Sequence, residues 1–550
     1  MTDREKAISY LADGHALLRA YGLYGSSEED HVFAIDRALG NLTGASTGAL
    51  APRAGFSAPE AAAALQALYE AKRLVTTRSA IDGRRIILGD WFMSLAVGLA
   101  LPLRTPLLTE IISMEFCQIG ADANRPAYRA SRKAFCKTVD KFTDALCSEQ
   151  ACADTNYRPG TESGSIPKTK TPQTLVIKGA ATLQNKLLSA LDAGYFKTAA
   201  LETRAALAQM EAWFSEKYAS GSAGEMDGWI YGAIMSGGKR LRPMLVRLCA
   251  GFGNGFDESS VINIMSTIEL MHSASLVHDD IVDRSPLRRS RATINAEKGD
   301  GYAAMCGFKM IADSLKLSTE DYPEKVTRII AQIPMQMCIG ELHQFDIENR
   351  PELQSEEEYY RRIGRKTATL IEGSCACGAI LGGSSGNVAD TVSAYGRSLG
   401  LLFQLRDDLL DYTPGAGAPG NSGKPISQDM ERGIYSLPLL HAMEQLSITD
   451  KNEAAKLDSV LRKHIKSASD LDYLNLMAEQ AGGLEYARDA IEHYRASALS
   501  TLSLLPQGAY TEALALLVNA LAEPAAPARQ GRSGPLSADT KVLRLKHAKQ

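Results

Sequence analysis

The chain has 550 residues, which is more than one ordinary core requires and suggests two to four domains. Hydrophobic residues make up 45% and charged residues 23%, a composition that excludes wholesale disorder. Sixty basic against 64 acidic residues give a net charge of −4, so a global basic field for nucleic acid is excluded. The nine cysteines, an odd number, and the lack of a signal-peptide pattern in Met1–Ala20 predict reduced thiols in a cytoplasmic setting.

The first region in chain order, residues 1–154, is predicted to be a small helical domain. Its longest mainly apolar run, Trp91–Leu103, has 13 residues and is too short to span a membrane as a helix, so we expect a buried helix. From Thr155 to Gln173 the chain is rich in Thr, Ser, Pro, Gly and Lys and nearly lacks large apolar side chains. Such a stretch cannot bury enough surface to fold, and we predict a linker over 155–180.

The second region, residues 181–522, has the apolar spacing of helices almost throughout. Segments such as Val261–Val277, Thr391–Leu405 and Glu485–Leu505 repeat apolar residues three and four positions apart. Prolines and glycines cluster between such segments, as in Pro414–Gly423, where helices must stop. The sequence therefore predicts an all-α chain whose larger region can form a helical bundle with a deep central cavity.

The last segment, residues 523–550, has the composition of a solvated tail. It carries six Lys and Arg residues against two acidic ones. We expect a disordered basic tail, with weak attraction to an anionic membrane or ligand as the alternative.

Two six-residue motifs in the second region have the same form. His278–Asp283 reads HDDIVD and Arg406–Asp411 reads RDDLLD, so each places carboxylates at positions i, i+1 and i+4. Positions i and i+4 lie one turn apart on the same helix face, where stacked carboxylates repel unless they share a cation. Oxygen ligands favour Mg²⁺, and both copies follow apolar helical segments, which is the wrong place for solvated acid. The pair of motifs therefore predicts a Mg²⁺ site.

Cations that could bind phosphate stand apart from the acids in the chain. Gly237–Pro243 reads GGKRLRP and offers three basic groups beside a glycine pair that permits close approach to the backbone. Arg288 and Arg289 follow the first acidic motif by one short loop. Lys366 opens another apolar helix, and Lys424 lies in the loop after the second motif. Each alone could be a surface charge, but together they suit two multiply charged phosphate ligands.

In this order, the motifs resemble those of the trans-polyprenyl diphosphate synthases, a family that includes farnesyl, geranylgeranyl and longer-chain synthases. The resemblance runs from about Lys197 to Leu521 and rests on GGKRLRP, ELMHSASLVHDDIVD, RR, GRKTA, LGLLFQLRDDLLDY, GKPISQD and SLP. It implies an all-α isoprenoid synthase helical bundle, with the two aspartate motifs facing each other across the cavity mouth. It also implies a homodimer that condenses isopentenyl diphosphate with an allylic diphosphate.

The resemblance assigns roles position by position. The ligands that it implies for three Mg²⁺ ions are Asp279, Asp280, Asp283, Asp407, Asp408 and Asp411. The residues that it implies for the allylic diphosphate are Arg288, Lys366, Thr367, Gln404 and Lys424. Those for isopentenyl diphosphate are Lys239, Arg242, His272 and Arg289. The residues expected to drive ionisation of the allylic C–O bond are Asp279, Asp280, Asp283, Lys366 and Asp407. The proton is then lost to the released diphosphate, so no dedicated His or Glu base is expected.

The helix before the first aspartate motif bears on product length. In the family, the product grows down the cavity below this motif, and a bulky residue one turn upstream blocks it. Ala274 and Ser275 stand there and Met271 lies a further turn down, so we predict an open tunnel and a long-chain all-trans product. A farnesyl or geranylgeranyl product is the alternative, if another helix supplies the floor.

The chain departs from the family pattern at three places. Ser290 stands where the family usually has Gly, and Ala292 where it usually has Pro. Gly307–Lys309 reads GFK where the family has Gly-Asp-Tyr. None of these changes removes a metal or diphosphate ligand, but they could perturb the loop and the helix behind the site.

A partial counterpart of that missing Gly-Asp motif occurs in the first region. Gly89–Ala96 reads GDWFMSLA, and the stretch up to Gly120 loosely parallels the one from Gly307 to Gly340. The region has no DDxxD and no GGKR, and it resembles the small subunit of two-component heptaprenyl or hexaprenyl diphosphate synthases. This implies a fusion of two subunits through the linker. The alternative is an unrelated helical extension that adds stability or mediates oligomerisation.

Other classes of function fit the sequence less well. A class I terpene cyclase binds one diphosphate, and the second DDxxD and the set that includes Lys239 and Arg242 argue against it. A catalytically silent regulatory partner is disfavoured by the intact acidic and basic sets. Cys375–Cys377 has no second pair and lies in an apolar helix, so packing explains it better than metal or redox chemistry. No nucleic-acid partner is expected, and membrane contact is at most peripheral, for product release.

Overall fold

The structure is a computed structural model that describes residues 197–219, 224–253, 255–289, 291–317, 322–412 and 428–522, together with Gly89. The predictions for the N-terminal domain (apart from Gly89), for the linker and for the basic tail lie outside the described residues. Those for Ser290 and Lys424 lie outside them as well. The fold and the site below therefore concern the second region.

Helices account for nearly all elements of the described residues. The first half contains α8 (Lys197–Ala219), α9 (Glu225–Met235), α10 (Leu241–Ala250), α11 (Glu258–Val282), α12 (Ile294–Lys298), α13 (Asp300–Leu317) and α14 (Glu324–Ile347). The second half contains η2 (Pro351–Leu353), α15 (Glu356–Ile363), η3 (Gly364–Ala368), α16 (Thr369–Leu381), α17 (Gly386–Leu410), α18 (Gln428–Glu431), α19 (Leu437–Thr449), α20 (Lys451–Leu461), α21 (Ala468–Gln480), α22 (Gly483–Leu502) and α23 (Ala509–Ala522). One short antiparallel hairpin pairs β1 (Leu287–Arg288) with β2 (Arg291–Ala292). The all-α prediction is confirmed for this region.

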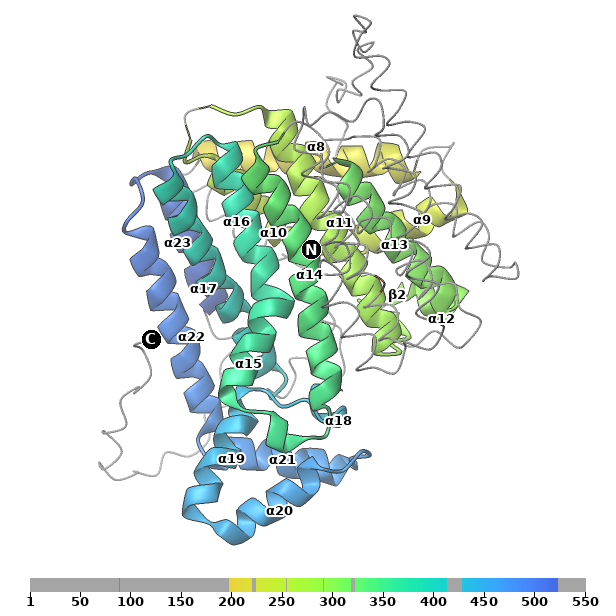
Figure 1. The fold of residues 1–550 in the computed structure, drawn as a ribbon, viewed down its shortest axis with the longest axis vertical. Helices are drawn as coiled ribbons and strands as arrows, with labels where there is room; N and C mark the ends of the chain where they lie inside the picture. Colours follow the sequence, from red (N-terminus) through yellow and green to blue (C-terminus); the bar gives the residue numbers. More distant parts are fainter. Residues whose placement is uncertain are drawn as a thin grey trace, which may run out of the picture.

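The long helices form a bundle along the long axis of the described region (Figure 1). Helices α10, α11, α13, α14, α16 and α17 run along this axis, and the closest packing joins α11 to α13, α16 to α17 and α17 to α22. Helices α8 and α9 cross one end, and α19, α20 and α21 form a small lobe at the other. This arrangement leaves the C-terminal ends of α11 and α14 near the lobe.

Helix α11 shows why the first acidic motif stands at a helix end inside the bundle. The side chain of Asp257 caps the helix by accepting a hydrogen bond from the backbone N–H of Ser260. The residues from Val261 to Met271 are all buried, polar ones such as Asn263 and Glu269 included, so the helix lies in the core and is covered on every side. It ends at Val282 with Asp283 as its C-cap, which brings the aspartates to the last turn.

The segment η3 is a π-helical turn between α15 and α16, and it carries Lys366 and Thr367. Such widened turns are rare inside helices and frequent at functional sites. The turn packs closely against α14, because a Cβ added at Gly340 would lie 2.9 Å from the backbone nitrogen of Lys366. A larger residue at this position would push the turn away from α14.

The departure at Gly307–Lys309 is accommodated by packing. The Phe308 side chain is fully buried, and its ring centroid lies 5.1 Å from that of His278. Lys309 forms ion pairs with Asp313, at 2.9 Å, and Asp227, at 3.3 Å. At the place of the Gly-Asp-Tyr motif, α13 thus makes an apolar contact with His278 and an ion-pair network through Lys309.

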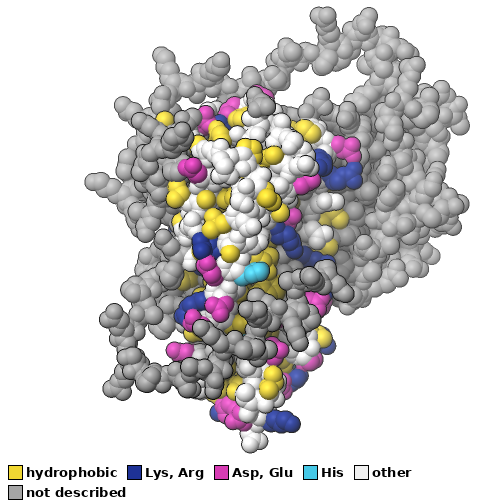
Figure 2. All heavy atoms as spheres, turned by 90° about the vertical axis from the view of Figure 1, so that its left-hand side faces the viewer, with side chains coloured by type: hydrophobic (Ala, Val, Ile, Leu, Met, Phe, Trp, Pro, Cys, Tyr) yellow, Lys and Arg dark blue, Asp and Glu magenta, His cyan; other side chains and the backbone are white. Residues whose placement is uncertain are grey.

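One face of the described region carries side chains of mixed character. On the face in Figure 2, acidic and basic side chains are interspersed, with apolar side chains among them. No helix among the described residues is long and apolar enough to cross a membrane.

Candidate active site

The middle aspartate of the first motif has protein partners. Asp280 is 5% exposed, and its Oδ1 accepts a hydrogen bond of 2.7 Å from Nε of Arg288 on the β1–β2 hairpin. The Asn295 side chain donates to the backbone carbonyl of Asp280 at 3.2 Å. Arg288, predicted to bind the allylic diphosphate, is therefore bonded to a carboxylate of the motif itself. Asp279 and Asp283 stand at the i and i+4 positions, which share a helix face.

The second motif repeats this arrangement with neutral partners. Asp408 is 8% exposed and accepts hydrogen bonds from the Tyr359 hydroxyl, at 2.8 Å, and from Nε2 of Gln404, at 2.7 Å. Burial, reinforced by the charge of Asp429, raises the pKa of Asp408 to about 6. Asp407 and Asp411 occupy the i and i+4 positions of this motif, near the end of α17.

The π-helical turn lies between the two motifs. Lys366 forms an ion pair with Glu341 of α14 and donates a hydrogen bond of 3.3 Å to Oε1 of Gln344. Burial opposes the charge on Lys366, but the carboxylates of Glu341, Asp279 and Asp283 outweigh it and raise the pKa of the amine. On the other side, the Thr367 hydroxyl donates to Oε1 of Gln404 in α17 at 2.8 Å. Adjacent residues of η3 thus contact the surroundings of both motifs.

The region around Asp279, Asp283, Glu341 and Lys366, called the mouth below, is rich in negative charge, and this affects the Glu341 carboxylate. Burial, partly offset by Lys366 and reinforced by Asp279 and Asp283, raises the pKa of Glu341. A carboxylate whose charge is disfavoured in this way would be stabilised by added positive charge. Metal ions or further cations could supply it.

A second set of cations surrounds His272. Nη1 of Arg242 lies 3.1 Å from Nε2 of His272, and Arg289 donates a hydrogen bond to the backbone carbonyl of Gly237. Burial, together with the charge of Arg242, lowers the pKa of His272 well below its usual value, so the ring is neutral at neutral pH. Burial lowers the pKa of Arg242 to about 10, which leaves this side chain charged.

The GGKR loop is held by its buried arginine. Arg240 has a positive φ of 46° and forms ion pairs with Glu269, at 2.5 Å, and Glu211, at 3.2 Å. The neighbouring Lys239 feels the charge of Asp407, which partly offsets the lowering of the lysine pKa by burial. The loop therefore approaches the second aspartate motif, and the structure brings the predicted cations Lys239, Arg242 and Arg289 together with His272.

The predicted chain-length residues lie on α11 above the first motif. Ala274 is fully buried and Met271 is 3% exposed, both within the hydrophobic cluster that α11 shares with α13 and α14. Ser275 is half-buried and donates to the backbone carbonyl of His272 at 2.9 Å. Small side chains do stand at the two positions one turn above Asp279.

The donor chemistry of the mouth suits Mg²⁺. Among the described residues, no three Asp, Glu, His or Cys side chains come together closely enough to hold a metal ion by themselves. The available donors near the motifs are carboxylate and amide oxygens, and Mg²⁺ usually takes one or two carboxylates with waters and substrate phosphates. Ligands from the two motifs therefore fit ions whose remaining ligands come from a diphosphate.

Several residues of the site were not predicted from the sequence. Glu341 and Gln344 stand three positions apart in the apolar run of α14, and this buried acid could have been noticed there. Tyr359, Glu348 and Arg432 carry no such sequence signal, because their partners lie far away in the chain. Their contacts emerge only from the packing of α14, α15 and the segment after α18.

The chain matches the family model described as polyprenyl synthetase over residues 228–476. It is 33% identical over 284 residues to heptaprenyl diphosphate synthase component 2 of Bacillus subtilis, which covers 52% of this chain and 78% of that protein. It is 34% identical over 288 residues to octaprenyl diphosphate synthase of Escherichia coli, covering 52% of this chain and 85% of that protein.

Solved structures show the same fold. A decaprenyl diphosphate synthase from Rhodobacter capsulatus superposes with a TM-score of 0.54 at 29% identity, covering 62% of this chain and 98% of that chain. A heptaprenyl diphosphate synthase from Staphylococcus aureus gives 0.52 at 26% identity, covering 58% and 98%. The described helices are thus an isoprenoid synthase bundle, as the motifs predicted.

These similarities agree with the two acidic motifs and the two cation sets of the site. The chain belongs to the polyprenyl synthetase family, and it is a prenyltransferase. The family predicted from the motifs is confirmed.

Proposed function

We propose that this protein is a Mg²⁺-dependent synthase that joins isopentenyl diphosphate to an allylic diphosphate and makes a long all-trans polyprenyl diphosphate. The observation that carries the proposal is the presence of two cation sets of different kind. Lys366 stands among the carboxylates of the mouth, which suits a diphosphate bound with metal. Arg242, Arg289 and the neutral His272 form a set that suits a diphosphate bound directly.

At the first set, Asp279, Asp283, Asp407 and Asp411 would hold Mg²⁺, for which three ions are proposed. Bound Mg²⁺ would neutralise the departing diphosphate and so promote ionisation of the allylic C–O bond. Lys366 donates to that diphosphate, and Thr367 orients the Gln404 amide. Asp280 and Asp408 were predicted as metal ligands too, but their contacts with Arg288, and with Tyr359 and Gln404, favour a role in positioning each motif.

At the second set, Lys239, Arg242 and Arg289 hold the diphosphate of isopentenyl diphosphate. The Nε of Arg242 is buried and has no hydrogen-bond partner among the described residues, so a phosphate oxygen would satisfy it. The isopentenyl double bond attacks the allylic cation, and the proton passes to the released diphosphate. His278 is engaged with the backbone carbonyl of Ala304 at 3.1 Å, which disfavours a role as base.

Product length and assembly are part of the same proposal. Small residues at Ala274 and Ser275 leave room for a long chain to grow beside Met271. The relatives from B. subtilis and E. coli are named as heptaprenyl and octaprenyl synthases, which supports a long product. A homodimer in the cytoplasm, with at most peripheral membrane contact for product release, is proposed as well.

Substrate omission tests the function. Purified protein receives Mg²⁺, farnesyl diphosphate and radiolabelled isopentenyl diphosphate, and butanol-extractable label is counted. We expect label in the product only when both diphosphates and Mg²⁺ are present, and none in excess EDTA. A hydrocarbon formed from farnesyl diphosphate alone, detected by gas chromatography of a hexane extract, would instead indicate a terpene cyclase.

We propose that residues 1–154 act as a fused small subunit. Residues 155–180 would link this subunit to the catalytic region. A protease site inserted into the linker allows cleavage after folding, and the two parts are then separated by size. Loss or shortening of the product upon separation, restored by mixing, supports the proposal. An unchanged product after separation would mean that the first region is an accessory extension.

A further inference from the structure

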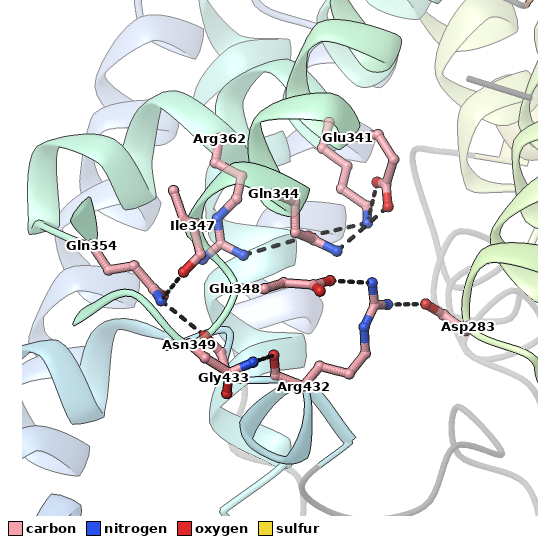
Figure 3. Close-up of polar contacts among 11 residues, drawn as sticks. Asp283, Glu341, Gln344, Ile347, Glu348, Asn349, Gln354, Arg362, Arg432 and Gly433 are labelled. Atoms are coloured by element: carbon pink, nitrogen blue, oxygen red, sulfur yellow. Dashed lines mark hydrogen bonds and ion pairs between the residues drawn. The ribbon is translucent and has the colours of Figure 1, made fainter. Parts of the chain in front are cut away.

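Arg432 bridges two elements of the active-site mouth. Its guanidinium forms an ion pair with Asp283 through Nη1 and, through Nη2, one of 2.7 Å with Glu348 (Figure 3). Arg432 lies 149 residues beyond Asp283 in the chain, just after α18, and its side chain is 21% exposed. Arg432 belongs to none of the motifs to which the sequence assigns a role.

The backbone that carries Arg432 is held in place by two polar side chains. Nε2 of Gln354 donates to the carbonyl of Gly433 at 2.8 Å, and the N–H of Tyr435 donates to Oε1 of the same amide at 2.8 Å. The backbone N–H of Asn349 donates to the backbone carbonyl of Gly433 at 3.0 Å. Its side-chain Nδ2 donates to the backbone carbonyl of Arg432 at 3.3 Å. The segment is therefore docked against the end of α14 on both sides of Gly433 (Figure 3).

Gly433 makes this docking possible. Its φ is +75°, a conformation that L residues with side chains rarely adopt. A Cβ at this position would lie 2.2 Å from Oδ1 of Asn349. The turn thus requires glycine, and it presents the preceding Arg432 toward the first aspartate motif.

Two glutamates of α14 anchor cations in the same way. Glu341 binds Lys366, and Glu348, at the C-cap seven residues further on, binds Arg432. Positions seven apart lie two turns along nearly the same helix face. Each cation reaches from its glutamate toward the first aspartate motif, since the charges of Asp279 and Asp283 act on Lys366 and Asp283 pairs with Arg432.

Two cations, the Arg432 guanidinium and a metal ion, would compete for the Asp283 carboxylate. It pairs with Arg432, and in the proposed function it is also a ligand of Mg²⁺. The carboxylates of Asp279, Asp283, Glu341 and Glu348 act on the two cations Lys366 and Arg432, so added positive charge at Asp283 is electrostatically favoured. A metal ion that takes Asp283 would leave one side of the Arg432 guanidinium available while Glu348 still holds the other.

We propose that Arg432 is a binding residue of the allylic diphosphate, anchored on Glu348 as Lys366 is on Glu341, and that it passes from Asp283 to the diphosphate when Asp283 takes up metal. The inference rests on the proposed function of the site. It adds to that function a cation whose position is built by Gln354, Asn349 and Gly433.

Two binding measurements on the whole protein test this exchange without turnover. Mn²⁺, which accepts the same oxygen ligands as Mg²⁺, is titrated alone, and free Mn²⁺ is read by electron paramagnetic resonance. An unreactive allylic thiodiphosphate is titrated at saturating Mg²⁺ by calorimetry. In Arg432→Gln, we expect Mn²⁺ alone to bind about threefold to tenfold tighter, because its competitor is gone, and the thiodiphosphate to bind about tenfold weaker.

A second variant predicts the opposite effect on metal. In Glu348→Gln, Arg432 loses its anchor and pairs with Asp283 alone, so Mn²⁺ alone should bind weaker than in the wild type. The matched control is Arg361→Gln, because Arg361 forms two ion pairs on α15, with Glu357 and Glu358, and should leave both affinities unchanged. Misfolding could not produce opposite changes in the two variants.

The results that would overturn the inference are specific. Thiodiphosphate binding within twofold of wild type in Arg432→Gln, or Mn²⁺ binding that weakens in both variants, would show that Arg432 is only a structural clamp. If wild-type protein itself fails to bind the thiodiphosphate in the presence of Mg²⁺, the proposed function of the site fails, and this inference fails with it.

Discussion

The two acidic motifs have the same spacing but different surroundings. In the first motif the middle aspartate is held by a charged partner, Arg288, from a hairpin that follows directly in the chain. In the second motif the middle aspartate is held by two neutral donors, Tyr359 and Gln404. Burial, reinforced by the charge of Asp429, raises the pKa of Asp408 to about 6, although both neutral donors act to lower it. Equal spacing therefore does not imply equal electrostatics.

Within each motif, we assign different roles to the outer and the middle aspartates. The outer aspartates are proposed to hold metal, and the middle ones to fix each helix end. Substitutions that separate outer from middle positions, or the first motif from the second, can break or sharpen this division.

The largest expected effect is the loss of an outer aspartate. Asp283→Asn and Asp407→Asn should each lower the condensation rate by about 10³-fold or more, because a neutral amide weakens binding of the metal that stabilises the leaving diphosphate. Steady-state rates with labelled isopentenyl diphosphate measure the effect. The matched control is Asp390→Asn on α17, whose exposed carboxylate pairs only with Lys325 in the contacts described. Near-normal rates in either outer variant would contradict the assignment.

A smaller effect is expected at the second cation set. Arg242→Gln should raise KM for isopentenyl diphosphate about 10- to 100-fold, the value of a lost charge-assisted hydrogen bond, and change KM for the allylic substrate little. Initial rates with each substrate varied in turn separate the two effects. Arg397→Gln, an exposed arginine on α17, is the control. An equal rise in both KM values would mean that the cation sets do not distinguish the substrates.

Product length provides a separate readout on α11. Ser275→Phe should shorten the product, because a bulky side chain one turn above Asp279 blocks growth of the chain. Ser275→Ala, which keeps the position small, should leave the product length unchanged. Reversed-phase chromatography of the dephosphorylated products measures both. If Ser275→Phe gives the wild-type product, another helix sets the floor of the tunnel.

The middle aspartate of the second motif is tested through its tyrosine. Tyr359→Phe removes the hydroxyl that bonds Asp408 and should lower the free energy of unfolding by about 1–3 kcal/mol. Urea denaturation followed by circular dichroism measures it. The adjacent Tyr360→Phe removes a hydroxyl without touching Asp408 and should lower the stability less. Equal losses in the two variants would contradict a specific role of the Tyr359–Asp408 bond.

A pH dependence of stability is expected at Asp408. Because its pKa is raised to about 6 from 3.8, the folded chain takes up a proton there before the unfolded chain does. Stability from this group is therefore gained as the pH falls from above 6 toward 4, by at most about 3 kcal/mol. The free energy of unfolding of wild type minus that of Asp408→Asn should rise over this interval. A difference that falls instead would mean that Asp408 stays ionised in the fold.

The sequence predicted the class of fold and the chemistry of the motifs because both depend on short-range patterns. Apolar spacing of three and four residues determines a helix, and carboxylates at i and i+4 share its face wherever it packs. The choice between outer and middle aspartates did not follow from the sequence. The partner of Asp408 in α15 lies 49 residues away, and such a contact depends on how the helices pack.

The same limit applies to the cations. Lys366 could be predicted from the GRKTA motif, but not its π-helical turn, which depends on the close approach of α14 at Gly340. Arg432 could not be predicted at all. Its role follows from the docking of a turn by Gln354 and Asn349, which are distant in sequence from Asp283.

The size of the product tests the central claim most directly. Full-length protein is incubated with Mg²⁺, farnesyl diphosphate and labelled isopentenyl diphosphate, and the dephosphorylated product is sized by chromatography against polyprenol standards. The account predicts one main product longer than the geranylgeranyl chain. A product that stops at the geranylgeranyl length, or no condensation product under any metal condition, would contradict it.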